Sequence, residues 1–173
     1  STYHVSTLVA EELSKKYPDS KIYCVDTLAA SMGEGLLVYL SALQKQAGKS
    51  IEEVRDFAEN NKLKLCHWFT VDDLNHLKRG GRVSATTAFV GSLLNIKPIL
   101  HVDDEGHLIN VGKVRGRKLS VETIFENMKK SAIDPSEQII FISHGDCEED
   151  ALTLKKMVEK EFHPKEIHIN TIG

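Results

Sequence analysis

Apolar residues recur at helical spacing in the first third of the chain, with one short apolar run between them. Such spacing predicts helices that bury one face, and a short run bounded by turn residues predicts a strand. Pro ends a helical pattern, and a Ser followed three residues later by Glu starts one. The predicted elements are a helix over 4–17, a strand over 21–25, a helix that opens at 31–35 and runs through Ala47, and a helix over 51–61 with Ser50 and Glu53 as its capping box.

The remaining two thirds of the chain alternate strand-like runs with single helices. Asp and Gly favour tight turns, so the run from Asp103 to Gly106 predicts a hairpin between its flanking strands. The apolar run QIIFIS, a helix and a further strand predict a βαβ unit. The predicted elements are a strand over 63–69, a short helix over 72–78, hairpin strands over 96–102 and 107–114, a helix over 119–132, and strands over 138–143 and 165–171 around a helix over 148–162.

The polar stretch ENNK around Asn61 is the predicted domain boundary. We therefore predict an α/β protein with two domains. Residues 1–61 would be the end of an N-terminal domain with a Rossmann-like parallel sheet, and residues 62–173 a second α/β domain with a mixed sheet. The sequence lacks an initial Met and stops inside a predicted strand, so we expect a fragment of a longer chain.

Composition argues against several classes of function. Hydrophobic residues make up 41% and charged residues 27%, as in ordinary globular proteins. No run of about 18 apolar residues predicts a membrane span. Three scattered cysteines without a CxxC pair support neither a disulfide framework nor a zinc site, and they fit a reducing cytoplasm. A net charge of −3 and 6% aromatic residues argue against nucleic-acid binding. No nucleotide, nucleophile or metal motif is present, so we assign neither catalytic residues nor metal ligands.

Positive charge is concentrated in one part of the chain. Residues 78–118 hold eight Lys/Arg and three Asp/Glu, a balance of +5, which leaves −8 for the rest. Two cationic turns lie here, Gly80-Gly81-Arg82 and the run from Lys113 to Lys118. An arginine supplies a planar donor fork for carboxylate or phosphate, so the two turns could converge on one anion or one acidic surface. A helix C-terminus, where Gly is common, is the alternative interpretation of the first turn.

A second candidate site opens the helix at residues 31–35, SMGEG. It follows a predicted strand and begins a helix, which is the setting of carboxylate and phosphate sites at helix N-termini. Ser31 and Gly33 are therefore candidate ligand-binding residues. The pattern lacks the third glycine of a dinucleotide fingerprint and the Lys of a Walker loop, and an N-cap with tight helix packing remains the alternative. His144, which ends the QIIFIS run, is a further candidate, with a helix-capping role as its alternative.

Short motifs follow one another in a specific order along nearly the whole chain. They are Asp26-Thr27 after a strand, Ser31-x-Gly33-x-Gly35-Leu36-Leu37, Asp72-Asp73-Leu74, Lys78-x-Gly80-Gly81-Arg82, Leu94-x-Ile96-Lys97-Pro98-Ile99-Leu100 and Lys113-x-Arg115-Gly116. This order resembles the DegV family, the fatty-acid-binding proteins of bacterial fatty-acid kinase systems that are often called FakB.

The resemblance implies a two-domain DegV-like fold that buries a long-chain fatty acid, such as palmitate or another C16–C18 chain, between its domains. It also implies that the protein is not an enzyme but a cytoplasmic carrier, which presents the acyl carboxylate to a separate fatty-acid kinase subunit. Thr2-Tyr3 resembles the tail of the family's Ser-Gly-Thr-Tyr loop, which makes Thr2 a candidate. The family's carboxylate-binding serine, threonine and histidine match no residue here, and the family's earlier α/β segment and Gly/His-rich ending are also missing.

Within this resemblance, the apolar run after Arg82 would line the acyl-chain pocket, and the cations at its mouth would bind the kinase. Burial of an acyl chain contributes about 0.8 kcal/mol per methylene. Plain core packing is the alternative for each lining residue. Two other functions stay open, a small-molecule kinase or kinase subunit related to dihydroxyacetone kinases and a regulatory anion-binding domain, as does transient membrane contact. The candidate lining residues are Phe89, Leu93, Leu94 and Ile96, and the candidate partner-binding residues are Arg82, Lys113 and Arg115.

Overall fold

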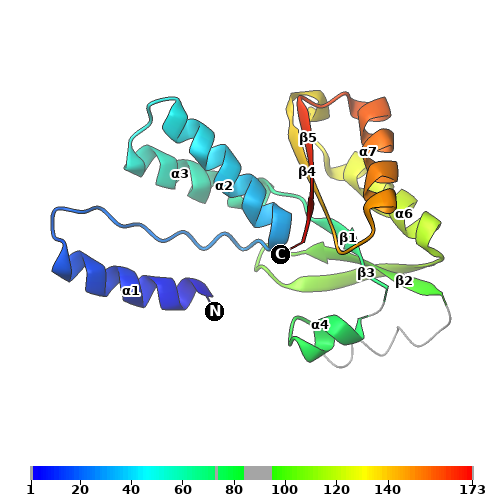
Figure 1. Cartoon of the computed structure of the whole chain (residues 1–173), viewed down its shortest axis with the longest axis horizontal. Coiled ribbons are helices and arrows are strands. Elements are labelled where there is room, and N and C mark those ends of the chain that lie inside the picture. Colours follow the sequence, from blue (N-terminus) through cyan, green and yellow to red (C-terminus); the bar gives the residue numbers. More distant parts are fainter. Residues whose placement is uncertain (1, 73, 84–94, 173) are drawn as a thin grey trace.

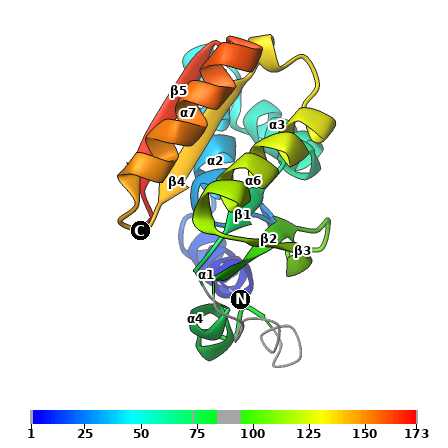
Figure 2. The same ribbon diagram turned by 90° about the vertical axis from the view of Figure 1, so that its right-hand side faces the viewer.

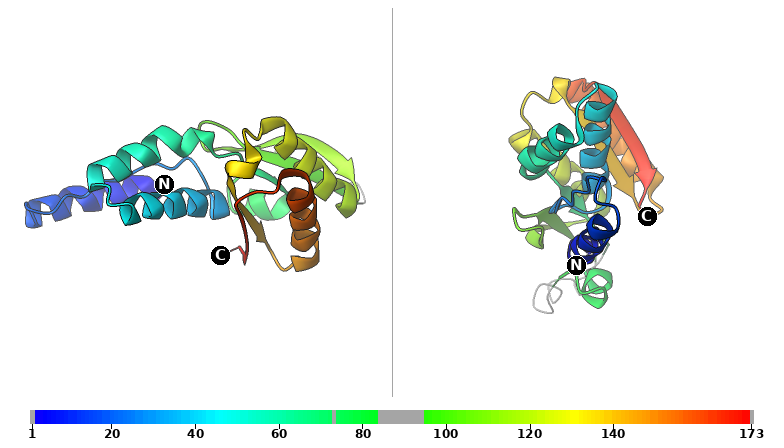
Figure 3. Two further views of the ribbon diagram at one scale, coloured as in Figure 1. Left: turned by 90° about the horizontal axis from the view of Figure 1, so that it is seen from above. Right: turned by 90° about the vertical axis from the view of Figure 1, so that its left-hand side faces the viewer.

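The computed structural model describes residues 2–72, 74–83 and 95–172. Helix α1 (Thr2–Lys16) confirms the first predicted helix and ends just before Tyr17-Pro18. It lies at one end of the molecule, as Figure 1 and Figure 3 show, and none of its residues is buried. The apolar residues of its repeat, Val5 and Leu8 among them, are more than half exposed.

Residues 21–30 form an extended connection and not the predicted strand over 21–25. A strand is defined by hydrogen bonds to a neighbouring strand, and the described part of the chain supplies no neighbour here. Helix α2 (Ser31–Gln46) and helix α3 (Ile51–Asn61) follow as predicted and pack together. Gly48 turns the chain between them with a φ of 84°, a conformation that glycine adopts without steric cost.

Three strands form an antiparallel sheet. They are β1 (Trp68–Thr70), β2 (Ile96–Val102) and β3 (Leu108–Arg115), in the order β1-β2-β3. The β2–β3 hairpin confirms the turn predicted from Asp and Gly. Strand β1 is shorter than the predicted 63–69, because Lys62–Lys64 form a 3-10 turn, η1. The register shifts after Ile99, which leaves Val111 as an extra residue in β3, a β-bulge.

The C-terminal part contains the predicted βαβ unit. Strands β4 (Ile139–His144) and β5 (Glu166–Thr171) pair in parallel, and α7 (Glu148–Phe162) connects them. Helix α6 (Arg117–Ser131) and the 3-10 turn η3 (Pro135–Glu137) lead from the hairpin to β4. The fold is thus α/β with both antiparallel and parallel pairings, which lie in two sheets.

Helix α6 packs on one face of the antiparallel sheet, and the short helix α4 (Asn75–Arg79) lies on the other side (Figure 2). Leu74 and Leu100 form a fully buried core on the α4 side, with Leu77 packed against them. On the α6 side, the Trp68 Nε1–H donates to Ser131 Oγ at 3.1 Å. Leu100 therefore identifies the face on the α4 side, and Trp68 identifies the face on the α6 side.

Helix α2 also packs on strand β4, so the two predicted domains are in contact. Tyr39 of α2 lies 5.6 Å, centroid to centroid, from the rings of both Phe141 and His168. The Tyr39 hydroxyl donates to Glu166 at 3.3 Å. The boundary near Asn61 remains a prediction, but the structure shows which elements meet across it: α2 from residues 1–61, and β4 and β5 from residues 62–173.

Candidate functional site

The start of α2 is the first part of the candidate site. Ala30 precedes the helix without any side-chain capping bond, so the positive end of the helix dipole keeps amide groups that no side chain satisfies. Ser31, the first helical residue, has a φ of 53°, which is uncommon for a residue other than glycine. Its hydroxyl lies 3.3 Å from the hydroxyl of Ser143, near the carboxyl end of β4. Two hydroxyl groups and a helix N-terminus are thus brought together from opposite halves of the chain.

Gly33 lies in the same first turn and has a specific packing role. A Cβ atom built on Gly33 would be 1.7 Å from Nε2 of His67, so only glycine leaves room for this imidazole. The close packing of Gly33 supports the alternative that the sequence left open, a glycine used for tight contact. A ligand-binding role for Gly33 remains a prediction.

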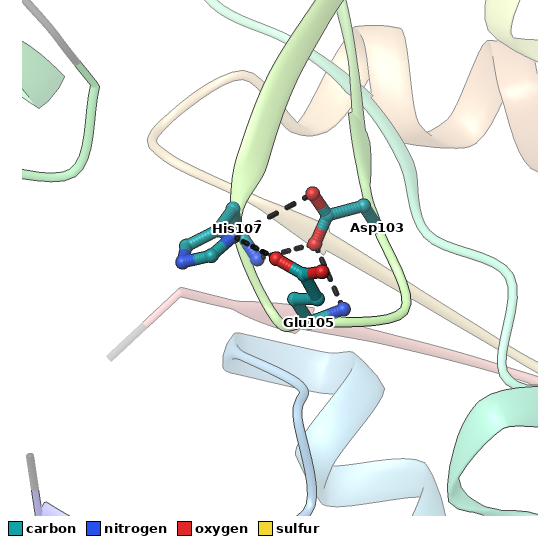
Figure 4. A group of neighbouring side chains, drawn as sticks. All are labelled: Asp103, Glu105 and His107. Atoms are coloured by element: carbon teal, nitrogen blue, oxygen red, sulfur yellow. Dashed lines mark hydrogen bonds and ion pairs between the residues drawn. The ribbon is translucent and has the colours of Figure 1, made fainter.

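The tip of the β2–β3 hairpin contacts the segment just before α2. A Cβ on Gly106 would lie 3.3 Å from Cα of Leu28, so the tip rests on the segment that precedes α2. Asp103 Oδ1 accepts hydrogen bonds from the backbone N–H groups of Glu105, at 3.0 Å, and His107, at 2.8 Å. Figure 4 shows these side chains grouped at the turn.

The same three side chains, Asp103, Glu105 and His107, have ligand atoms that lie close enough together to hold a metal ion. Their bonds, however, are those of an Asp-closed turn. The His107 backbone N–H, more than any other group, holds the pKa of Asp103 below its usual value. We therefore interpret the group as the closure of the hairpin, which is the role that the sequence pattern predicts.

Two of the three predicted partner-binding cations are related by the sheet. Arg115 lies opposite Ile96 and Lys113 opposite Pro98 in the β2–β3 register. Register partners point to the same face, and residues two apart in a strand share it. Leu100 therefore marks this face as the α4 side, because it packs against Leu74 and Leu77.

Arg82 lies at the C-terminal end of α4, where its backbone N–H donates to the Leu77 carbonyl at 2.8 Å and its guanidinium donates to the carbonyl of Gly80. All three cations are exposed, and within the described ranges neither Lys113 nor Arg115 forms an ion pair. The structure thus places two exposed cations on the α4 side of the sheet and a third at the end of α4 itself.

Other cations of the positively charged segment are neutralised by carboxylates. Lys97 Nζ lies 2.6 Å from Asp72, and this hydrogen bond is the main cause of a lowered pKa of Asp72. Arg117 Nε lies 2.7 Å from Asp150, and its Nη2 donates to Cys147 Sγ at 3.2 Å. The positive charge counted along residues 78–118 therefore includes Lys97 and Arg117, which form structural ion pairs. Among the residues that the structure describes, Arg82, Lys113 and Arg115 have no such role.

The remaining predicted residues are widely distributed. Thr2 lies at the exposed start of α1, and Ile96 is half-buried at the start of β2. Phe89, Leu93 and Leu94 lie outside the described residues. Sequence analysis missed Ser143 and His67 because each lies far along the chain from its contact on α2.

His144 ends strand β4. Its Nδ1 is buried and, in the described part of the chain, has no hydrogen-bond partner. It does not cap the next helix, whose N-cap is Cys147. The sequence identified His144 as a candidate because it lies at the end of a predicted strand.

These features define a class: an α/β protein in which a helix N-terminus, a pair of hydroxyl groups and an exposed cationic sheet face lie outside the ordinary hydrophobic core. Comparison with known proteins then gives the family. The model of the DegV family of uncharacterised proteins matches residues 1–173, the whole chain, and the chain belongs to this family. A DegV domain-containing protein of Clostridium perfringens is 53% identical over 172 residues, which are 99% of this chain and 59% of the relative.

Solved structures agree with this assignment. A DegV family protein from Ruminococcus gnavus, refined with vaccenic acid, has a TM-score of 0.88 at 25% identity and is matched over 98% of this chain and 60% of its own. A DegV family protein from Thermus thermophilus, described for its fatty-acid binding, has a TM-score of 0.79 at 28% identity over 99% of this chain and 59% of its own. The chain thus spans about three fifths of the length of these relatives.

No helix among the described residues is long and apolar enough to cross a membrane. The family, the α/β fold and the likeness to fatty-acid-binding structures, all expected from the order of motifs, are confirmed.

Proposed function

We propose that this chain is part of a cytoplasmic fatty-acid carrier that holds a long-chain fatty acid between two domains and presents its carboxylate to a partner fatty-acid kinase. The observation that carries the proposal is the TM-score of 0.88, at 25% identity, to a relative refined with vaccenic acid. The carrier itself performs no phosphoryl transfer in this proposal, and it needs no cofactor besides the bound acid, a C16–C18 chain.

The start of α2 supports a role near the polar end of the ligand. A buried carboxylate needs donors or a positive potential, and a helix N-terminus without a side-chain cap offers both. Ser31 and Ser143 add two hydroxyl groups that are 3.3 Å apart. We propose Ser31, with the first turn that Gly33 belongs to, as part of the ligand-binding region, and Thr2 as a further contributor.

The acyl chain requires apolar surface. Ile96 is half-buried on the α4 side of the sheet. We propose that it lines the acyl-chain pocket together with Phe89, Leu93 and Leu94, which precede it in the sequence. At about 0.8 kcal/mol per buried methylene, a pocket for a C16 chain gives tight binding without any strong polar contact.

The cationic side of the sheet supports partner docking. Arg82, Lys113 and Arg115 are exposed, and exposed charges mainly raise association rates with an acidic partner. We propose that these three cations bind the kinase and not the fatty acid.

Native mass spectrometry tests the carrier proposal. The full-length protein that contains these residues, purified from bacterial cells, should carry an added mass of one C16–C18 fatty acid. A protein that purifies without lipid and takes up none from added palmitate would overturn the proposal, as would ATP turnover by the protein alone.

A charge-matched pair of variants tests the docking role. Arg115→Ala should slow acyl-phosphate formation by the kinase severalfold at low salt and leave bound fatty acid unchanged. Lys118→Ala removes the same charge from α6, where Lys118 lies 3.9 Å from Glu122, and should have little effect. Equal rates for the two variants would exclude a docking role for Arg115.

A further inference from the structure

His67 lies where the two predicted domains meet, just before β1, and its ring reaches across to α2. Its backbone is fixed by β2, because the His67 carbonyl lies 2.9 Å from Nδ1 of His101. His101 in turn stacks on Trp68, with ring centroids 4.5 Å apart. The His67 ring is therefore presented by a rigid support and not by a free loop.

The contact of this ring with α2 is unusually close. Its Nε2 occupies the space of a Cβ on Gly33, within the first helical turn. Nε2 is buried, and the described residues offer it no hydrogen-bond partner. A nitrogen in this position is tolerated when it is unprotonated, because a lone pair needs less compensation against a Cα–H group than an N–H bearing positive charge.

The surroundings also disfavour a charged ring. Burial lowers the pKa of His67 most, and the charge of His101 lowers it further. The first turn of α2 adds the positive end of a helix dipole. On α2 the charged residue beside Gly33 is Glu34, which is exposed, and the neighbouring titratable residue in sequence, Cys66, is exposed as well.

We propose that His67 is a pH-responsive positioning residue: when neutral, its ring seats the first turn of α2, and with it Ser31, against the second domain, and when protonated it leaves Gly33 and frees that turn. The sign follows from the lowered pKa. The contact is complete above about pH 6.5, the ordinary value for His, and weakens as the pH falls below it. Each pH unit in that window favours release by up to about tenfold.

Two measurements on the whole chain test the proposal. The NMR titration of the His67 ring should give a pKa below 6.5 and, at neutral pH, a proton on Nδ1. Exchange of the Gly33 and Glu34 amides, which donate to the Ala30 carbonyl, should accelerate roughly tenfold per pH unit below the ordinary His value after correction for intrinsic rates. A His67 pKa at or above 6.5, or exchange that does not change with pH, would overturn the proposal.

Matched variants separate this role from general destabilisation. His67→Gln cannot be protonated, so its exchange profile should be flat, whereas His107→Gln, at the exposed hairpin tip, should keep the pH dependence. Gly33→Ala should displace the ring and return the pKa of His67 toward 6.5. Gly35→Ala is the control in the same helix, since its Cβ would lie no closer than 3.7 Å to Met32 Sδ. An equal His67 pKa in both glycine variants would contradict the proposed packing of the His67 ring on Gly33.

None of these measurements requires a ligand, so their outcome is independent of the carrier proposal. Only the consequence for Ser31 rests on that proposal. If Ser31 contacts the fatty acid, lowering the pH should weaken binding more in the unmodified protein than in His67→Gln. The His67 titration could be confirmed while fatty-acid binding depends equally on pH in both proteins. That result would refute the ligand role of this turn and leave the pH-dependent packing of His67 on Gly33 intact.

Discussion

The first turns of α2 and α3 begin in opposite ways, although the two helices are neighbours. Helix α3 starts with a capping box: Ser50 Oγ accepts from the Glu53 N–H at 3.2 Å, and Glu53 accepts from the Ser50 N–H at 2.8 Å. Helix α2 starts without a side-chain cap and with Ser31 in the left-handed region. Its contacts are with Ser143 and His67, residues that are distant in sequence.

This difference separates a structural helix start from a candidate functional one. A capping box satisfies its own amide groups, so it has little left to offer a ligand. An uncapped start costs stability but keeps donors and a positive potential available. Because its position depends on contacts from the other half of the chain, it also responds to changes there.

The largest expected difference in stability between the two helix starts comes from replacing Gly33, which packs against the His67 ring. Gly33→Ala should lower the free energy of unfolding by about 1–3 kcal/mol, the usual cost of overpacking, despite the better helix propensity of Ala. Gly35→Ala should be neutral or raise it by up to about 1 kcal/mol. Urea denaturation of both variants measures this difference. If Gly33→Ala is as stable as Gly35→Ala, then α2 does not depend on His67.

Removal of the two serine hydroxyl groups sharpens the contrast. Ser50→Ala should cost about 1 kcal/mol, the usual value for an N-cap. Ser31→Ala should change stability by less than about 0.5 kcal/mol, because an exposed hydroxyl that caps no amide contributes little. Denaturant unfolding of both variants is the measurement, and equal losses would show that Ser31 stabilises its helix as Ser50 does.

Backbone strain offers a smaller effect of opposite sign. Ser31 has a φ of 53°, a conformation that costs other residues roughly 1–2 kcal/mol and that glycine adopts freely. Ser31→Gly should therefore stabilise the protein by up to about 1 kcal/mol. Ser50→Gly, at a residue with an ordinary φ of −65°, should not stabilise it. Thermal unfolding compares the two variants, and a loss of stability in Ser31→Gly would contradict the strain.

The same contrast explains what the sequence could and could not predict. Ser50 and Glu53 lie three residues apart, so local chemistry identified the start of α3. The apolar run of β4, with a helix and a second strand after it, likewise predicted the parallel unit correctly. Residues 21–25 were predicted as a strand from a short apolar run, which was wrong because strand formation depends on a neighbour that the described chain does not supply.

The candidate site was less predictable, for a related reason. Ser31 and Gly33 were identified from a local pattern, but their partners lie 112 residues away, at Ser143, and 34 residues away, at His67. A single sequence contains no signal for such contacts. The cationic run from Lys113 to Lys118 was expected to form a turn, but Lys113 and Arg115 lie in β3, where the register places them on the face of α4. Their docking role remains a prediction.

The smallest expected effect is a separation of two pH windows. Lys21 donates to Glu52 at 2.5 Å, and chiefly for this reason the pKa of Glu52 falls to about 2. The pKa of Glu53 is lowered mainly by the Ser50 backbone N–H. A carboxylate with a lowered pKa contributes stability above its ordinary value of 4.5 and loses it as the pH falls toward 2.

The start of α3 should therefore stay closed at pH values where the start of α2 already opens. Amide exchange, corrected for intrinsic rates, should show the first turn of α2 opening below about pH 6.5 and that of α3 only below about 4.5. Added salt should shrink the acidic transition, because the Lys21–Glu52 pair is exposed, and should affect the His67 transition less, because that ring is partly buried. Simultaneous opening of both turns would mean that the two helices respond to acid as one unit.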